Sequence, residues 1–269
     1  MRILLSNDDG ILAAGLAALR RAVADLGEVI VVAPDSPQSA AGHAITLRAP
    51  LTVQQVRLDD AAGEATFTGL SVDGRPADCV RLAVRKLLPA PPDLVLTGIN
   101  AGANVGINVF YSGTVAAAAE AAMLGLPAVA FSAAMTGGEV DFARIGRFCR
   151  SVLDGLLAWG ISGGQVVNVN IPPLTPGLPR GIRVVPQSTA GVEDSYHRQE
   201  HPAGLESYRL GDAFNFAATG DQTDVACLEE GYITVTPLKV DMTDHAHLVA
   251  LSDWPWPPLP GHPEPGMRL

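Results

Sequence analysis

Four side chains with oxygen ligands follow apolar segments of this chain, where buried strands are expected to end. Asp8 and Asp9 come one residue after the segment RILLS, and Ser39 lies in the loop after EVIVVA. Asn100 follows the segment DLVLT. Carboxylate, hydroxyl and carboxamide oxygens are hard ligands, which suit Mg²⁺ or Mn²⁺ better than zinc. If the three loops meet at one edge of a sheet, this set predicts a site for a divalent metal ion.

The adjacent acids Asp8 and Asp9 allow two interpretations. Two carboxylates repel each other in a low-dielectric cleft unless one is protonated or a cation lies between them. An isolated Asp-Asp-Gly after a strand is equally consistent with a helix N-cap that interacts with the helix dipole. The oxygen ligands after the other two segments favour the metal.

A glycine-rich segment from Gly98 to Thr114 is the second chemical feature. It ends in Ser112-Gly113-Thr114, where a helix is expected to begin. Free amides at a helix start, together with hydroxyl groups, bind anions. The segment has no lysine and its glycine spacing differs from GxGxxG, so it is neither a Walker A loop nor a dinucleotide fingerprint. A tight loop capped by Ser112 or Thr114 is the alternative to a phosphate site.

His43 lies four residues after Ser39. At that position it could contact a leaving group or donate a proton. A single histidine in a loop is more often structural, and both roles stay open.

Composition limits the classes of function. The formal net charge of -10 argues against long nucleic acids, which need clustered Lys and Arg. The cysteines, Cys79, Cys149 and Cys227, are odd in number and far apart, as expected for reduced thiols in a cytoplasmic protein. The start MRILLSNDDG resembles a strand more than a signal peptide, and the apolar stretch 115–131 is too interrupted to cross a membrane.

The order of elements predicts the fold class. Strand-like and helix-like patterns alternate through RILLS, EVIVVA, a helix from Pro76, DLVLT, PAVAFS, a helix over about 141–159 and QVVNVNIP. This alternation predicts an α/β fold, doubly wound around a mostly parallel sheet, over residues 1–187. Residues 44–73 contain two segments with a polar alternation, ITLRAPLTVQQVRL and EATFTGLSVD, which predict two strands of an inserted β-hairpin.

The remainder of the chain has a different character. Residues 188–230 are polar and predict an extended arm, and GYITVTPL predicts a closing strand, so that 188–250 forms a second unit. Residues 251–269 form a Pro-rich tail that is expected to be extended or disordered.

The chain resembles the SurE family of stationary-phase survival proteins. The resemblance is carried by SNDDG, APDSPQSAAGHAITL, TGINAGANVG, YSGTVAAAAEA, PADCV, VNVNIP and TDVACLEEGYITVTPL. These motifs occur in order and reach to about residue 245. One departure is Arg75, in Gly74-Arg75-Pro76, where the family often has threonine.

The resemblance implies a Rossmann-like core with a swapped C-terminal arm, assembled into homodimers or homotetramers. It implies a nucleotidase that acts on nucleoside 5′- and 3′-monophosphates, and sometimes on short polyphosphate. Matched by motif, the ligands of one divalent ion per subunit, Mg²⁺ or Mn²⁺, are Asp8, Asp9, Ser39 and Asn100. The implied phosphate contacts are Asn104, Ser112, Gly113 and Thr114, with His43 as a further candidate at the substrate.

The corresponding mechanism is metal-assisted hydrolysis in which Asp8 or Asp9 orients or deprotonates the attacking water. A phosphatase of the haloacid-dehalogenase type is one alternative, although its two acids are spaced as DxD. A non-catalytic nucleotide sensor on the same fold is the other. An NAD-dependent enzyme is disfavoured because the fingerprint is missing.

Overall fold

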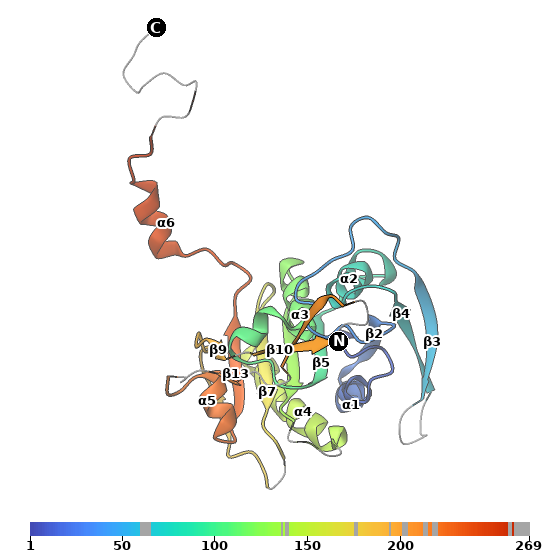
Figure 1. Cartoon of the computed structure of the whole chain (residues 1–269). Coiled ribbons are helices and arrows are strands. Elements are labelled where there is room, and N and C mark those ends of the chain that lie inside the picture. The colour runs from blue at the N-terminus through green and yellow to red at the C-terminus, as the bar shows by residue number, and fades with distance from the viewer. Residues whose placement is uncertain are drawn as a thin grey trace.

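A nine-stranded sheet forms the centre of the computed structural model of this chain (Figure 1). The structure describes residues 1–59, 66–135, 137, 140–174, 177–193, 195–200, 204–211, 215–216, 220–257 and 260. In the order in which they neighbour one another, the strands are β3 (Val53–Asp59), β4 (Thr66–Val72), β2 (Glu28–Pro34), β1 (Arg2–Ser6), β5 (Leu94–Ala101), β6 (Ala128–Ala133), β7 (Val166–Ile171), β13 (Ile233–Leu238) and β8 (Ile182–Val184).

The sheet is mostly parallel, with antiparallel pairs toward its edges. β2, β1, β5, β6 and β7 are parallel to their neighbours in this series, whereas β3 is antiparallel to β4 and β13 is antiparallel to β7. The prediction of a doubly wound, mostly parallel sheet is therefore confirmed.

Helices cover both faces of the sheet, which explains why its central strands are apolar along their length. α1 (Ala14–Val23) and α4 (Phe142–Trp159) pack on one face, where Ile3 and Leu5 of β1 point. α2 (Pro76–Leu82) and α3 (Gly113–Met123) pack on the other face. Leu4 points to that second face, because successive side chains of a strand alternate.

The strand order reverses at β1. Its neighbours are β2 on one side and β5 on the other, and both are parallel to it. The loops after β1 and β5 therefore leave the sheet in opposite directions and open a crevice between them, where ligands bind in doubly wound sheets.

The predicted inserted hairpin is present but shorter than its pattern indicated. β3 and β4 pair antiparallel, and β4 pairs parallel with β2, so the hairpin extends the main sheet. Residues 45–52, predicted as part of the first strand, are not in a strand. Pro50 lies in this stretch, and proline cannot donate a hydrogen bond to a neighbouring strand.

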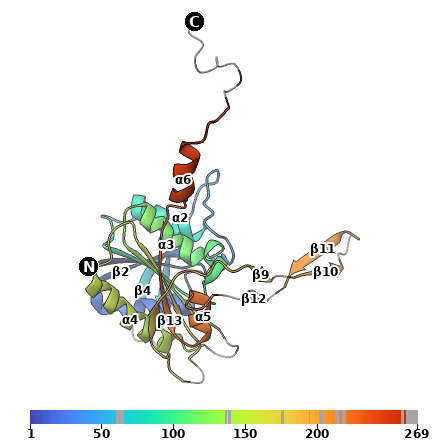
Figure 2. The ribbon, with the colours of Figure 1, turned by 90° about the vertical axis from the view of Figure 1, so that its left-hand side faces the viewer.

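Residues 188–230 contain an arm of short strands. β10 (Tyr196–Glu200) and β11 (Glu206–Leu210) form an antiparallel hairpin that projects away from the sheet (Figure 2). At its root, β9 (Val192–Glu193) pairs with β12 (Asn215–Phe216). The prediction of irregular structure is wrong for α5 (Asp224–Glu229), a helix capped where the Thr223 side chain accepts a hydrogen bond from the Ala226 amide.

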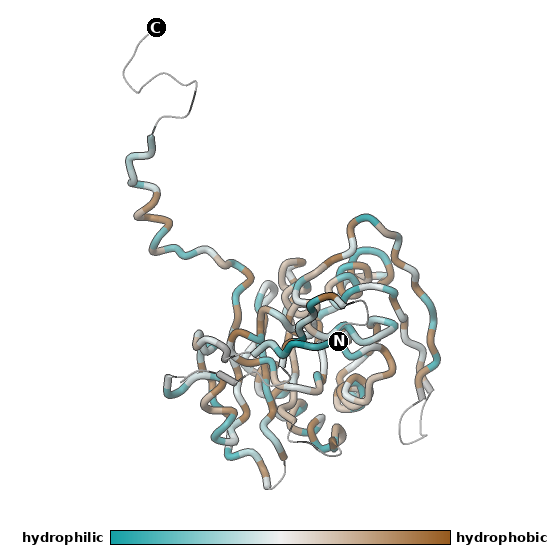
Figure 3. The backbone as a smooth tube through the Cα atoms, in the orientation of Figure 1, coloured by the Kyte–Doolittle hydropathy of each residue, from teal (hydrophilic) through white to brown (hydrophobic). Residues whose placement is uncertain are grey.

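The chain after β13 also leaves the body of the molecule. α6 (His245–Ser252) stands apart from the sheet in Figures 1 and 2 and has no buried residue. Figure 3 shows hydrophobic residues along this helix, and its Leu248, Val249 and Leu251 are exposed. Within the predicted tail 251–269, positions 258–259 and 261–269 lie outside the described residues. No helix in the described parts of the chain is both long and apolar enough to cross a membrane.

The cysteines are buried and unpaired, as expected. Cys79, Cys149 and Cys227 lie in α2, α4 and α5. Burial raises the pKa of the Cys79 and Cys149 thiols well above their usual range.

Candidate active site at the carboxyl edge of the sheet

A cleft of about 600 Å³ opens beside the ends of β1 and β5. Six residues that were predicted for the site line it, namely Asp8, Asp9, Ser39, Asn100, Asn104 and Ser112. The other lining residues are Ala40, Ala101, Ala103, Ile107, Asn108, Tyr111, Tyr196 and Leu210. The loops after three strands therefore meet as the sequence predicted, whereas Gly113, Thr114 and His43 do not line this cleft.

Asp8 lies between the end of β1 and the start of α3. Its Oδ1 accepts a hydrogen bond from the Thr114 hydroxyl at 2.5 Å, and its Oδ2 accepts one from the Thr114 backbone amide at 3.1 Å. Asp8 is 5% exposed. The positive end of the α3 dipole thus acts on a buried carboxylate.

The second acid, Asp9, is partly buried beside Asp8. Its Oδ2 accepts a hydrogen bond from the Ala101 amide at 3.2 Å, and its other oxygen has no partner among the described residues. Burial raises the pKa of both carboxyl groups, and the charge of Asp9 raises the pKa of Asp8 further. A cation between the two acids would offset this cost.

The loop that carries Ser39 is fixed to the site by its backbone. The Gln38 amide donates to the Asp8 carbonyl at 2.7 Å, and the Gly42 amide donates to the Tyr111 carbonyl at 3.0 Å. Arg75, the departure from the family pattern, donates a hydrogen bond to the side chain of Gln38. Ser39 is therefore anchored on both sides although it is itself exposed.

Asn100 lies at the end of β5 and uses its amide nitrogen within its own loop. Its Nδ2 donates to the Gly102 carbonyl at 2.7 Å. Gly102 has φ +138°, a conformation that favours glycine and allows this close turn. The side-chain oxygen of Asn100 is the atom left to act as a ligand.

Several of the groups predicted to contact phosphate at the start of α3 make hydrogen bonds within the protein. Ser112 caps the helix, because its hydroxyl oxygen accepts a hydrogen bond from the Val115 amide at 3.0 Å. Thr114, predicted to contact phosphate, instead donates both its amide and its hydroxyl to Asp8. The Gly113 amide and the Ser112 hydroxyl proton are the donors that remain for an anion.

Asn104 lines the cleft from a buried position, with 7% of its surface exposed. Its Nδ2 donates to the hydroxyl of Ser132 at 2.8 Å. Its backbone is bonded to Asn168 and Asn170 of β7. These partners were not predicted from the sequence.

His43 contacts Glu120, a buried acid on α3. The distance from His43 Nε2 to Glu120 Oε2 is 3.0 Å, and Arg81 Nε lies 2.8 Å from Glu120 Oε1. Burial alone raises the pKa of Glu120, but the hydrogen bond with His43 and the charge of Arg81 outweigh it and hold the pKa below its ordinary value. This contact favours a structural role for His43, and a contact with substrate stays a prediction.

We expect Glu120→Gln to lower the free energy of unfolding by about 1–3 kcal/mol at pH 7, because the hydrogen bond with His43 loses its charge assistance and the ion pair with Arg81 is lost. A lowered pKa means that the contribution of Glu120 is present above its ordinary pKa of 4.5 and is lost as pH falls through the folded value. Denaturant titrations should show the difference between wild type and variant shrinking below about pH 4.5.

Glu28→Gln is the matched control, since Glu28 pairs with Arg2 at an exposed position. It should change the free energy of unfolding far less than Glu120→Gln. An equal effect of both variants, or a constant effect of Glu120→Gln down to about pH 3.5, would contradict the assignment.

The ligand set fits a hard divalent cation. Among the described residues, no group of three or more His, Cys, Asp or Glu could hold a metal ion. A metal in this cleft would therefore be held by the carboxylates of Asp8 and Asp9 with the neutral oxygens of Ser39 and Asn100. That set suits Mg²⁺ or Mn²⁺ and lacks the nitrogen and sulfur ligands of zinc sites.

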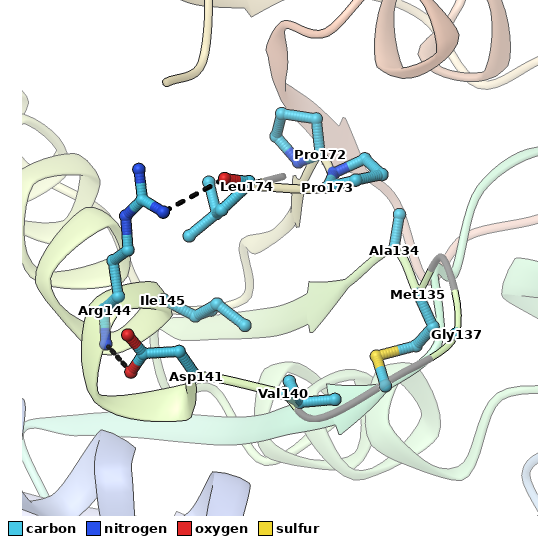
Figure 4. A pocket seen from close by; sticks show the side chains of 10 residues that line it. All are labelled: Ala134, Met135, Gly137, Val140, Asp141, Arg144, Ile145, Pro172, Pro173 and Leu174. Carbon is cyan, nitrogen blue, oxygen red and sulfur yellow. Dashed lines mark hydrogen bonds between the residues drawn. The ribbon is translucent and has the colours of Figure 1, made fainter. Parts of the chain in front are cut away.

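A cavity of about 460 Å³ lies near the ends of β6 and β7, on the side of α4 (Figure 4). Its charged residues are used for structure: Arg144 donates to the carbonyls of Leu174 and Gly177, and Asp141 caps α4. The cavity lacks the paired carboxylates of the Asp8 cleft, so the Asp8 cleft is the candidate active site.

Sequence reasoning missed several residues around the cleft. Tyr111 lies in the glycine-rich segment, and Tyr196 and Leu210 come from the arm. Tyr111 and Tyr196 give the cleft two aromatic lining residues. The signal that could have indicated Asn168 and Asn170 is the pair of polar residues within the otherwise apolar VVNVNI of β7.

Together, the doubly wound fold and this cleft define an α/β protein with an oxygen-ligand site beside a helix start. The chain belongs to the SurE family: residues 3–194 match the family model of survival protein SurE. It is 42% identical over 252 residues to the 5′-nucleotidase SurE of Christiangramia forsetii, covering 94% of this chain and 96% of the relative.

Two further comparisons agree. The 5′-nucleotidase SurE of Vibrio cholerae is 42% identical over 255 residues, which cover 94% of this chain and 97% of the relative. The crystal structure of the SurE protein from Aquifex aeolicus superposes with a TM-score of 0.78 at 36% identity, covering 94% of this chain and 98% of that one.

Proposed function

We propose that this chain is a metal-dependent nucleotidase that hydrolyses nucleoside 5′- and 3′-monophosphates to nucleoside and phosphate, with short polyphosphate as a further substrate. The observation that carries the proposal is the meeting of two carboxylates, the buried Asp8 and the partly buried Asp9, with the start of α3 at the strand-order switch point. The relatives named 5′-nucleotidase SurE support the same reaction.

The residues of the proposed site divide the tasks of this reaction, and Asp9 has two of them. Asp8, Asp9, Ser39 and Asn100 hold the ion. When bound, a divalent cation supplies a Lewis acid that offsets phosphate charge and lowers the pKa of water. We assign the free oxygen of Asp9 the further role of orienting the attacking water and accepting its proton.

The remaining donors act on the phosphate group. The Gly113 amide, the Ser112 hydroxyl and the Asn104 carboxamide are fixed before substrate binds, and they stabilise the charge that develops on the phosphate oxygens. Thr114 acts through Asp8, whose orientation it sets. His43 contacts Glu120 and thereby anchors its own loop. We propose that His43 acts near the leaving group only indirectly, by holding this loop in place.

The wider organisation belongs to the same proposal. Residues 1–187 are the catalytic core, 188–250 the oligomerisation arm with its closing strand, and 251–269 a Pro-rich tail. The projecting hairpin and the exposed apolar residues of α6, Leu248, Val249 and Leu251, support a homodimer or homotetramer, because exposed apolar surface is stabilised when it is covered. Three unpaired buried cysteines support a cytoplasmic location.

A phosphate-release screen tests the function. Purified protein is assayed with nucleoside 5′- and 3′-monophosphates, ribose 5-phosphate and short polyphosphate, each with Mg²⁺, Mn²⁺ or chelator. We expect release from nucleoside monophosphates in the presence of metal and none with chelator. Equal phosphate release in the presence of metal and of chelator would show that the reaction does not need a cation, and would contradict this part of the proposal.

The same screen separates the alternatives. Nucleotide binding without phosphate release in saturating Mn²⁺ would indicate a sensor. A trapped phospho-aspartate would indicate the covalent route of haloacid-dehalogenase phosphatases.

A further inference from the structure

The face of the sheet under α3 changes from apolar to polar toward its carboxyl edge. Ala130 of β6 and Val166 of β7 belong to the apolar core on this face. Ser132 and Asn170 follow them and are paired neighbours across β6 and β7, so their side chains point to the same face. Asn168 lies two residues before Asn170 and also points there.

These polar side chains are completely buried. Ser132, Asn168 and Asn170 are each 0% exposed. The side-chain oxygen of Asn168 has no hydrogen-bond partner among the described residues. Burying a carboxamide with one end unpaired costs free energy, so stability alone does not account for asparagine at this position.

The hydrogen bonds of this cluster converge on one residue, Asn104. Asn168 Nδ2 and Asn170 Nδ2 donate to the Asn104 carbonyl at 2.7 and 3.2 Å. Asn170 Oδ1 accepts from the Asn104 backbone amide at 2.8 Å. Ser132 accepts from the Asn104 side-chain amide, also at 2.8 Å. Both backbone polar groups and the side chain of Asn104 are thus held by β6 and β7.

The loop around Asn104 needs this external support. Gly102 and Gly106 flank it with φ of +138° and +56°. Glycine leaves the backbone few conformational limits of its own. The position of Asn104 relative to Asp8 and the start of α3 is therefore set by the strands.

We propose that Ser132, Asn168 and Asn170 are positioning residues for catalysis, which act by fixing Asn104 toward the bound phosphate. The proposal rests on the proposed function, because it takes phosphate as the ligand of Asn104. Misplacing a contact in an active site by about 1 Å can reduce a rate on the order of 10²-fold. The cluster thus contributes to turnover without touching substrate.

Ser132→Ala is the main test, since it removes one oxygen atom and disturbs the fold least. We expect kcat/KM for a nucleoside monophosphate to fall about tenfold, mostly through kcat. Asn168→Ala combined with Asn170→Ala should lower it about 10²-fold. Mn²⁺ affinity, measured by calorimetry, should stay within about threefold in Ser132→Ala, because the proposed ligands are not part of the cluster.

Thr236→Val is the matched control. Thr236 lies opposite Asn168 on β13, is 1% exposed, and its hydroxyl has no partner among the described residues. It should keep the wild-type kcat and KM. A cluster that serves stability only would instead lower the melting temperature of Ser132→Ala and leave kcat per folded molecule unchanged, which would overturn the proposal.

The failure of this inference can be told from the failure of the proposed function. If wild-type protein with Mn²⁺ releases no phosphate from any nucleotide, the proposed function is wrong. If wild type is active and Ser132→Ala matches it in kcat and KM, only the positioning role is wrong.

Discussion

Asp8→Asn is expected to lower kcat for nucleoside monophosphates by about 10³-fold or more while the protein stays folded. The loss follows from removing one of two charged ligands, because a bound cation contributes several kcal/mol to a phosphoryl-transfer transition state. Stability should change little. Burial and the neighbouring Asp9 raise the pKa of Asp8, so a neutral amide relieves an unfavourable charge. The Thr114 backbone amide can still donate to the side-chain oxygen of the asparagine, and the Thr114 hydroxyl can turn to accept a hydrogen bond from its NH₂ group.

The measurement is phosphate release with Mn²⁺, together with thermal unfolding in chelator so that metal binding does not enter the comparison. Asp35→Asn is the control, because Asp35 follows β2 and is exposed, outside the cleft. It should keep wild-type activity. Near-normal release by Asp8→Asn would remove the carboxylate from the mechanism.

Gly113→Ala is expected to reduce kcat by about 10²-fold, although it changes no proposed metal ligand. A Cβ at this position would lie 2.7 Å from Asp8 Cβ, and 3.0 Å from both Asp8 Oδ2 and Pro76 Cγ. Alanine is favoured over glycine in helix interiors by about 1 kcal/mol, so helix propensity alone predicts a gain. The steric conflict between the added Cβ and Asp8 outweighs this gain, so the Asp8 side chain must move away from its native position.

Gly155→Ala provides the comparison within another helix. Gly155 lies in α4, and an added Cβ would meet nothing within 4 Å. That variant should raise the melting temperature slightly and leave kcat unchanged. Wild-type kinetics in Gly113→Ala would show that Asp8 tolerates a shift, and the close packing described here would then be unimportant for turnover.

The fold could be predicted largely because its signals are local. Buried parallel strands need continuous apolar segments, and the segments RILLS, EVIVVA and VVNVNI carry that signal. α5 is not predicted by the sequence pattern because it is a short helix in a polar stretch, where a single capping residue such as Thr223 is a weak signal. The stretch 45–52 was predicted as a strand from its alternation, a pattern that a loop before a strand can also show.

The location of the candidate site could be predicted from the sequence, whereas the hydrogen-bond partners within it could not. The rule that ligands bind beyond the carboxyl ends of parallel strands brought Asp8, Asp9 and Asn100 together from sequence. The partner of Thr114 could not be predicted, because Asp8 lies 106 positions away in the chain. The same holds for Glu120 in its run of alanines, whose partners His43 and Arg81 come from other elements.

The three buried thiols give this protein a built-in set of reporters. Cys79 lies on one side of the sheet, Cys149 on the other, and Cys227 next to the root of the arm. A buried thiol reacts with an alkylating reagent only when the structure around it unfolds locally and exposes the sulfur to solvent. Alkylation rates in native buffer, measured by peptide mass spectrometry, would therefore compare how often the structure around each cysteine unfolds locally, without any introduced label.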